Sequence, residues 1–173
     1  MTTQPRIFRL GTAKDVGKLQ AIEIRAGEIF RGIGMPDIAD APPTEDTVFQ
    51  KAINEELLFV VTVNNVPAGF ALMINHGDNS HLHQISIDHC FLGQGIGSAL
   101  LLHIINVCHT IGYKYITLST FIDVPWNLPF YQKHGFSRLP NDNLPPQLVA
   151  IRQHESDSGL IMSERTLMVF YLT

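Results

Sequence analysis

Cysteine is scarce in this chain of 173 residues, which has only Cys90 and Cys108. Two cysteines are too few for a disulfide framework or for a cysteine-rich zinc site. We therefore expect two reduced thiols in a cytoplasmic protein, and no bound metal ion.

Long apolar runs and clusters of positive charge are also missing. No stretch of about 18 apolar residues occurs, so no membrane span is predicted, and the first residues lack the apolar core of a signal peptide. Lys and Arg number 12 against 16 Asp and Glu, which gives a net charge of −4, and the pI is near 6.0. This balance argues against nucleic acid or an anionic membrane as the main partner. A small-molecule ligand is still possible, and the negative net charge favours a cationic one.

The composition that is present is that of a folded globular protein. Hydrophobic residues make up 45% of the chain and charged residues 16%, which is far from the composition of disordered segments. The length is suited to one domain with a substantial core. No internal repeat or low-complexity linker is found, so the sequence predicts a single domain over residues 1–173.

Alternating and continuous apolar runs, bounded by turn residues, predict the strands. These are Arg6–Leu10, Leu57–Val63, Val66–Ile74, His81–Asp88, Lys114–Thr120, Phe136–Leu139 and Arg165–Leu172. Helical periodicity with capping residues predicts helices from Thr12 or Asp15 to about Ile29, from Thr44 to about Asn54, over Gly95–Ile111 and over Trp126–His134. Asn64-Asn65 predicts a tight hairpin turn, and Gly112 a left-handed helix end. Arg31–Pro43 is predicted as an irregular loop, and Pro140–Gly159 as a polar insertion with one helical turn from Pro146. The fold class is mixed α/β.

A glycine-rich turn, Gly93-Gln94-Gly95-Ile96-Gly97, follows the strand that ends at Asp88. Strand, glycine turn and helix in this order place backbone N–H groups at a helix N-terminus, which favours a phosphate group. The turn lacks the Gly-Lys-Ser/Thr of a nucleotide-hydrolysing loop. Its late position and its spacing also differ from those of a dinucleotide-binding fold. A phosphate-bearing ligand at Gln94–Ser98 is the prediction.

Two segments resemble the GNAT family of N-acetyltransferases. Leu92–Gly97 resembles the acyl-CoA motif Gln/Arg-x-x-Gly-x-Gly/Ala, and Asp123–Phe136 resembles a later element in which an aromatic-Tyr pair precedes a short helix end and Gly-Phe. The expected order of strands also matches, so the resemblance covers nearly the whole chain. It implies a sheet of about seven strands with flanking helices, splayed between the fourth and fifth strands. Leu92 stands where the family usually has Arg or Gln, so backbone N–H groups are expected to hold the pyrophosphate.

The resemblance also implies roles for individual residues. Tyr131 is expected to protonate the departing thiolate, because the unperturbed phenol pKa of about 10 exceeds that of a thiol. Without the resemblance, the sequence fits equally well with Tyr131 as a core aromatic residue beside Phe130. His83 is the candidate general base, and a water chain is the alternative. The residues expected to bind acetyl-CoA are Ile85, Ser86, Ile87, Leu92, Gly93, Gln94, Gly95, Ile96, Gly97, Ser98, Asn127, Phe130 and Tyr131.

The acceptor site is expected to include Glu28, Phe30, Asp37 and Phe121, while Glu23 is assigned to a solvated helix face. No Cys-His-Asp arrangement follows from spacing, and the family transfers the acetyl group directly, so Cys90 is expected to take no part. The predicted reaction is acetyl transfer from acetyl-CoA to a primary amine. A non-catalytic acyl-CoA-binding module and a protein N-terminal or lysine acetyltransferase stay open as alternatives, as does assembly into a homodimer.

Overall fold

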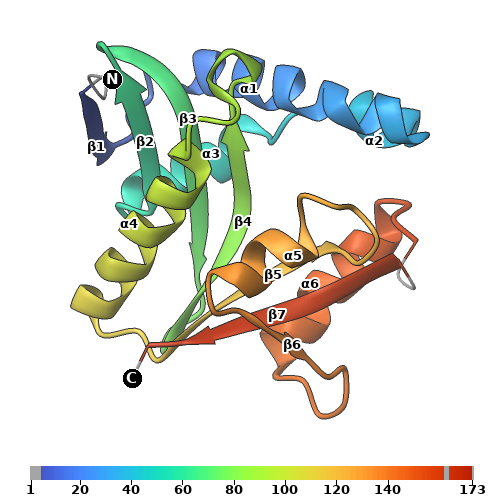
Figure 1. Cartoon of the computed structure of the whole chain (residues 1–173). Coiled ribbons are helices and arrows are strands. Elements are labelled where there is room, and N and C mark those ends of the chain that lie inside the picture. The colour runs from blue at the N-terminus through green and yellow to red at the C-terminus, as the bar shows by residue number, and fades with distance from the viewer. Residues whose placement is uncertain (1–4, 162–163, 173) are drawn as a thin grey trace. The chain divides into compact units, whose positions relative to one another are not determined.

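A computed structural model describes residues 5–161 and 164–172 (Figure 1). The strands form one mixed sheet of seven in the order β1-β2-β3-β4-β5-β7-β6. They are β1 (Arg6–Leu10), β2 (Leu58–Val63), β3 (Val66–Asn75), β4 (Asn79–Ile87), β5 (Tyr115–Phe121), β6 (Ser137–Leu139) and β7 (Arg165–Tyr171). The helices are α1 (Val16–Gly27), α2 (Pro36–Ala39), α3 (Asp46–Asn54), α4 (Ile96–Ile111), α5 (Leu128–Lys133) and α6 (Pro146–Asp157), with 3-10 turns η1 (Glu28–Ile33) and η2 (His89–Phe91). The predicted seven-stranded α/β fold is confirmed.

The described residues form two compact units. The first contains residues 5–75 and 83–107, and the second contains residues 76–82 and 108–172. Two elements are shared, since β4 passes from the second unit into the first after Leu82, and α4 passes from the first into the second after Val107. A single domain over 1–173 stays a prediction.

In the first unit, both faces of β2 are covered. All six residues of β2 are buried, and the strand pairs antiparallel with β1 and with β3. On one face, α1 and α3 pack on the sheet through a cluster of Leu19, Ile22, Phe49, Ala52, Leu58, Val60, Phe70 and Leu72. On the other face, the His103 ring of α4 stacks on Phe8 at 4.7 Å and meets the edge of Phe59. Burial on both faces explains why β2 is a continuous apolar run rather than an alternating one.

Two predicted turns have the expected backbone. Asn64 and Asn65 have φ values of 51° and 63°, the left-handed pair that a two-residue hairpin needs. Gly112 has φ 94°, and the N–H groups of Gly112 and Tyr113 donate to the carbonyl of Cys108 at the end of α4. Both predictions are confirmed.

β3 comes unusually close to the end of β4 at Gly69. A Cβ atom at this position would lie 2.7 Å from the carbonyl oxygen of Ser86 and 2.5 Å from Cδ1 of Ile87. The N–H of Asp88 donates to the carbonyl of Ala68 at 2.8 Å. Only glycine fits at position 69, and the backbone of β4 up to Asp88 is therefore held firmly against β3.

In the second unit, β5 lies between the first half of β4 and β7. Asn79–Leu82 pair in parallel with Tyr115–Leu118, and β7 pairs antiparallel with both β5 and β6. The carboxylate of Glu155 in α6 accepts hydrogen bonds from Ser119 and Arg165, which fixes α6 to one face. Ring contacts from Phe170 to Phe136 and from Phe136 to Tyr131 hold α5 over the other face.

The prediction for Pro140–Gly159 was wrong in extent, because in place of one helical turn from Pro146 the structure has the 12-residue helix α6, which begins at that residue. Pro146 occupies the first turn, where a missing N–H costs nothing. The helix is held by the buried Leu148 and by Glu155, whose carboxylate is 2.9 Å from Arg165. The apolar periodicity of the sequence did not predict this helix, because the residues that stabilise it lie in other elements. The predicted loop Arg31–Pro43 likewise contains part of η1 and the short helix α2.

The predicted capping roles were also wrong in detail. The N-cap of α3 is Glu45, and Thr44 instead donates from its N–H and hydroxyl to the carboxylate of Glu23, at 3.1 and 3.0 Å. Burial raises the pKa of Glu23 despite these two bonds. Glu23 therefore links α1 to the start of α3 and does not lie on a fully solvated face.

Asp15 is the N-cap residue of α1, yet its side chain makes no bond to the helix. Instead its carboxylate accepts two hydrogen bonds from Arg9, both at 2.8 Å, and a third from the N–H of Thr12. The bonds from Arg9 outweigh burial and lower the pKa of Asp15 to about 2. The carboxylate is thus stabilised as an anion in the folded chain.

This pair should make stability depend on acid pH. The folded pKa of Asp15 is depressed, so its contribution is present above its ordinary value of 3.8 and is lost as the pH falls towards about 2. In Asp15→Asn we expect the free energy of unfolding at pH 7 to drop by about 1–2 kcal/mol and this acid loss to shrink. Chemical denaturation across the pH range measures both. Asp142→Asn, at an exposed carboxyl, is the control, and an equal loss in the two variants would contradict the assignment.

Within the described residues, no helix is long and apolar enough to cross a membrane.

Candidate functional site

The glycine turn lies between η2 and α4 in the first unit and is exposed from Leu92 to Gly95. Gly93 and Gly95 have φ values of 74° and 72°, and a Cβ at either would meet nothing within 4 Å. The left-handed backbone, rather than crowding, therefore requires glycine at these two positions. Gly97 is already inside α4.

The turn presents backbone donors at the start of α4. The hydrogen-bond ladder of the helix begins where the N–H of Ala99 donates to the carbonyl of Gly95 at 3.1 Å. The N–H groups of Ile96, Gly97 and Ser98 belong to the first turn, which has no acceptors inside the helix. The buried side chain of Ile96 anchors this end to the core. Together with the helix dipole, these donors suit an anion such as a phosphate group.

A cation reaches the turn from a distant part of the sequence. The guanidinium of Arg6 in β1 donates to the carbonyl of Gln94 at 2.5 Å. Leu92 has no charge of its own. Arg6 therefore supplies a positive charge beside the glycine turn that position 92 does not provide. Sequence reasoning missed Arg6, because an isolated Arg at the start of a strand gives no sign of this neighbour.

The end of β4 leads directly into the turn. Ile85 and Ile87 are half-buried and Ser86 is buried, and the hydroxyl of Ser86 accepts a hydrogen bond from Gln84. Beyond them, the carboxylate of Asp88 accepts two bonds from Arg25 of α1, at 2.6 and 3.2 Å. The backbone expected to hold the thioester arm is thus rigid and lies in the same unit as the glycine turn.

His83 lies on β4 in the first unit, where it is exposed. The candidate acceptor residues Glu28, Phe30 and Asp37 belong to η1 and α2, which pack against each other and against α1. Glu28 already pairs with Arg31 at 3.2 Å, and Arg31 also binds Asp40. An amine at Glu28 would therefore compete with an arginine, whereas Asp37 is exposed in the first turn of α2.

Tyr131 lies in α5 of the second unit, where it is 9% exposed. Its ring contacts Phe130 and Phe136 in edge-on geometry. Burial raises the pKa of the phenol, while the positive charge of Arg165 opposes that shift. The group is fully protonated at neutral pH, which is the state that a general acid requires.

The remaining candidates of the second unit surround the ends of β5 and α5. Asn127 is the N-cap of α5, and its carbonyl accepts the N–H of Tyr131. Phe130 is half-buried, and Phe121 is buried with the guanidinium of Arg165 over its ring at 4.5 Å. The structure thus gathers the turn, the end of β4 and Arg6 in one unit, and Tyr131, Phe130, Asn127 and Phe121 in the other.

The two cysteines differ sharply. Cys108 is fully buried in α4, and burial raises its pKa to about 12, so its thiol is inert. Cys90 is exposed, next to His89 and close to Asp88. Spacing alone had suggested no Cys-His-Asp arrangement, because these three residues follow one another and only the 3-10 turn η2 brings their side chains together.

Comparison with known proteins gives a family match over part of the chain and similar folds over nearly all of it. The sequence pattern of the acetyltransferase (GNAT) family matches residues 28–136. The structure resembles the ribosomal-protein-S18-alanine N-acetyltransferase from Escherichia coli, with a TM-score of 0.70 and 20% identity over 98% of this chain and 95% of that one. It also resembles Arabidopsis thaliana Naa50 in complex with a bisubstrate analogue, with a TM-score of 0.64 and 15% identity over 95% and 97% of the two chains. N-acetylglutamate synthase from Neisseria gonorrhoeae, complexed with coenzyme A and N-acetyl-glutamate, matches with a TM-score of 0.73 and 16% identity over 99% of this chain and 36% of that one.

Proposed function

The chain belongs to the acetyltransferase (GNAT) family, and on this premise we propose that it transfers the acetyl group of acetyl-CoA to a primary amine. The family match over residues 28–136 carries the proposal. The left-handed turn at Gly93 and Gly95, with the first-turn donors of α4, supports it as a seat for the pyrophosphate.

In this proposal, each part of the site has one task. N–H groups from Gly93 to Ser98 bind the pyrophosphate, and Arg6 adds a positive charge beside Gln94. The backbone of Ile85–Ile87 holds the thioester arm and polarises the carbonyl. Asn127 and Phe130 flank the arm near Tyr131.

The transfer is a direct substitution at the thioester carbon. The amine nitrogen attacks that carbon, so a C–N bond forms and the C–S bond breaks. Tyr131 donates its phenolic proton to the departing thiolate, and the proton lost by the amine goes to a base, through water or through His83. Glu28, Phe30, Asp37 and Phe121 are proposed to line the acceptor site.

The acceptor is proposed only as a class. Two of the similar structures are a ribosomal-protein-S18-alanine N-acetyltransferase and Naa50 bound to a peptide-bearing bisubstrate analogue, so a peptide N-terminus is one candidate beside small amines. A direct test is calorimetric titration with acetyl-CoA, followed by a thiol-release assay on small amines, peptides with free N-termini and lysine peptides. Turnover on any of them supports the proposal. Tight binding without turnover would favour a non-catalytic module, and failure to bind acetyl-CoA would defeat both.

Arg6→Gln should weaken the binding of acetyl-CoA about 10-fold. The guanidinium keeps several N–H donors after bonding Gln94, and a charged hydrogen bond to phosphate contributes about 1.5–3 kcal/mol, part of which bulk solvent screens. Calorimetry at two salt concentrations measures the loss and its salt dependence. Lys18→Gln removes an exposed positive charge from α1 of the same unit and serves as the control. Equal losses in both variants would show that only net charge matters.

A further inference from the structure

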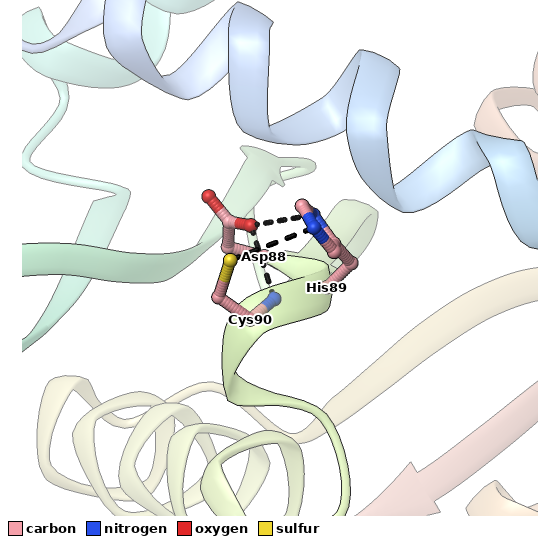
Figure 2. Close-up of side chains that lie close together, drawn as sticks. All are labelled: Asp88, His89 and Cys90. Atoms are coloured by element: carbon pink, nitrogen blue, oxygen red, sulfur yellow. Dashed lines mark hydrogen bonds and ion pairs between the residues drawn. The ribbon is translucent and has the colours of Figure 1, made fainter.

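A second reactive cluster lies on the turn that precedes the glycine loop. Asp88 is the N-cap residue of η2, and His89 and Cys90 are the first residues of that turn. Figure 2 shows the three side chains close together. Nδ1 of His89 is 3.1 Å from Oδ1 of Asp88, and Nε2 of the same ring is 3.5 Å from Sγ of Cys90. The imidazole therefore lies close to both a carboxylate and a thiol.

The neighbouring carboxylate of Asp88 decides which ring nitrogen of a neutral His89 carries the hydrogen. Burial raises the pKa of Asp88, but hydrogen bonds from Arg25 and from the N–H of Cys90 outweigh it and keep the pKa below its ordinary value. An ionised carboxylate only accepts hydrogen bonds, so Nδ1 of a neutral His89 carries the hydrogen. Its Nε2 then presents a lone pair to the thiol of Cys90. A histidine nitrogen this close to a thiol can take its proton and so activate a cysteine nucleophile.

The carboxylate of Asp88 is nearly buried and firmly bonded, whereas the thiol of Cys90 is open to solvent. Asp88 has a side chain that is 10% exposed, and its other oxygen is bound by Arg25 at 2.6 Å. The N–H of Cys90 donates to Oδ1 of Asp88 at 3.3 Å. Cys90 itself is exposed, and the side chain of His89 is 59% exposed. A small molecule can therefore approach the sulfur without any movement of the backbone.

Metal binding fits these positions less well. The three residues do offer ligand atoms that all lie within 4.8 Å of one another. The carboxylate of Asp88 is, however, already bonded to Arg25, at 2.6 and 3.2 Å. The guanidinium of Arg25 on Asp88 also repels a cation.

We propose that Cys90 is a thiol-exchange site for small anionic disulfides, with His89 as its general base. Nε2 of His89 takes the proton of the thiol, and the sulfur of Cys90 attacks one sulfur of the disulfide. A new S–S bond forms to Cys90 while the original S–S bond breaks, and the departing thiolate takes the proton from His89. The small disulfide is the oxidant, so electrons and protons balance. Arg25 and the donors at the start of α4 favour a negatively charged reagent.

The mixed disulfide would stand beside the glycine turn. The carbonyl of Cys90 already accepts a hydrogen bond from Gln94 of that turn at 3.4 Å, so an adduct on Cys90 would crowd and repel a bound pyrophosphate. Exchange at Cys90 would thus lower the affinity for acetyl-CoA reversibly. This consequence, unlike the exchange itself, rests on the proposed function.

The experiment incubates the whole protein with glutathione disulfide and follows the intact mass over time. We expect one adduct, on Cys90 by peptide mapping, which dithiothreitol removes. Its rate should fall about 10-fold or more in His89→Gln. The chain supplies a control, since Cys108 also has an exposed histidine next to it in the sequence, and His109→Gln should leave the rate unchanged. In Cys90→Ser no adduct should form, and thermal unfolding checks that each variant is folded.

Three results would overturn the proposal. These are equal rates in the wild-type protein and His89→Gln, equal labelling of Cys90 and Cys108, and stoichiometric zinc binding that is lost in Cys90→Ser, which would make the cluster a metal site. All exchange rates are measured without acetyl-CoA. Failure of exchange leaves the proposed acetyl transfer standing, and failure to bind acetyl-CoA leaves the exchange standing.

Discussion

Tyr131→Phe is expected to lower kcat by about 100-fold or more while the affinity for acetyl-CoA changes little. A positioned general acid contributes about 10²–10⁴-fold to a rate, and phenylalanine removes the proton donor while preserving the ring. The contacts of the ring with Phe130 and Phe136 should survive, so the fold should not change. A thiol-release assay gives kcat, and calorimetry gives the affinity.

Tyr171→Phe is the matched control for this experiment. Tyr171 belongs to the same unit and is 62% exposed, so loss of its hydroxyl should alter neither turnover nor stability. Unchanged turnover in Tyr131→Phe would remove the residue from the chemistry and leave it as a core aromatic. A loss of turnover that accompanies a lower melting temperature would point to packing instead.

Gly95→Val is expected to weaken acetyl-CoA binding by about 100-fold or more. Gly95 has φ 72°, a conformation in which a β-branched side chain is a severe outlier that costs about 1–3 kcal/mol. The turn would escape this strain by changing its backbone, which would redirect the donors from Gly93 to Ser98. Calorimetric titration with acetyl-CoA measures the loss.

Gly77→Val separates this local effect from general strain. Gly77 has φ 78°, and a Cβ there meets nothing within 4 Å, as at Gly95. Both variants should lose similar stability on heating, but only Gly95→Val should lose affinity. If the two variants bind acetyl-CoA equally well, the turn does not hold the pyrophosphate.

The sequence predicted most elements because their signals are local. Asn64-Asn65 and Gly112 have the chemistry of particular turns, and the buried strand β2 is continuously apolar, so these predictions needed no knowledge of distant residues. The glycine turn was predicted for the same reason, since the left-handed angles of Gly93 and Gly95 depend on the backbone alone. A strand, a turn and a helix that are adjacent in the chain stay adjacent in space.

What the sequence could not predict depends on partners far along the chain. The helix α6 is held by Arg165 and Ser119, and Glu23 is occupied by Thr44 of a later segment. Arg6 reaches Gln94 across 88 positions of sequence. The grouping of Asp88, His89 and Cys90 is local, yet a search for spaced catalytic residues overlooked it, because only the tight η2 turn directs consecutive side chains to one side.

The order of strands in the second unit has a consequence for synthesis on the ribosome. β7 follows β6 in the chain but lies between β5 and β6 in the sheet. The first unit is complete in sequence once Val107 has emerged, whereas β5 and β6 have no common neighbour until Arg165–Tyr171 is translated. A nascent chain that pauses before β7 therefore leaves an unpaired edge at β5, beside the apolar residues Ile116 and Leu118. Such an edge invites aggregation and chaperone binding.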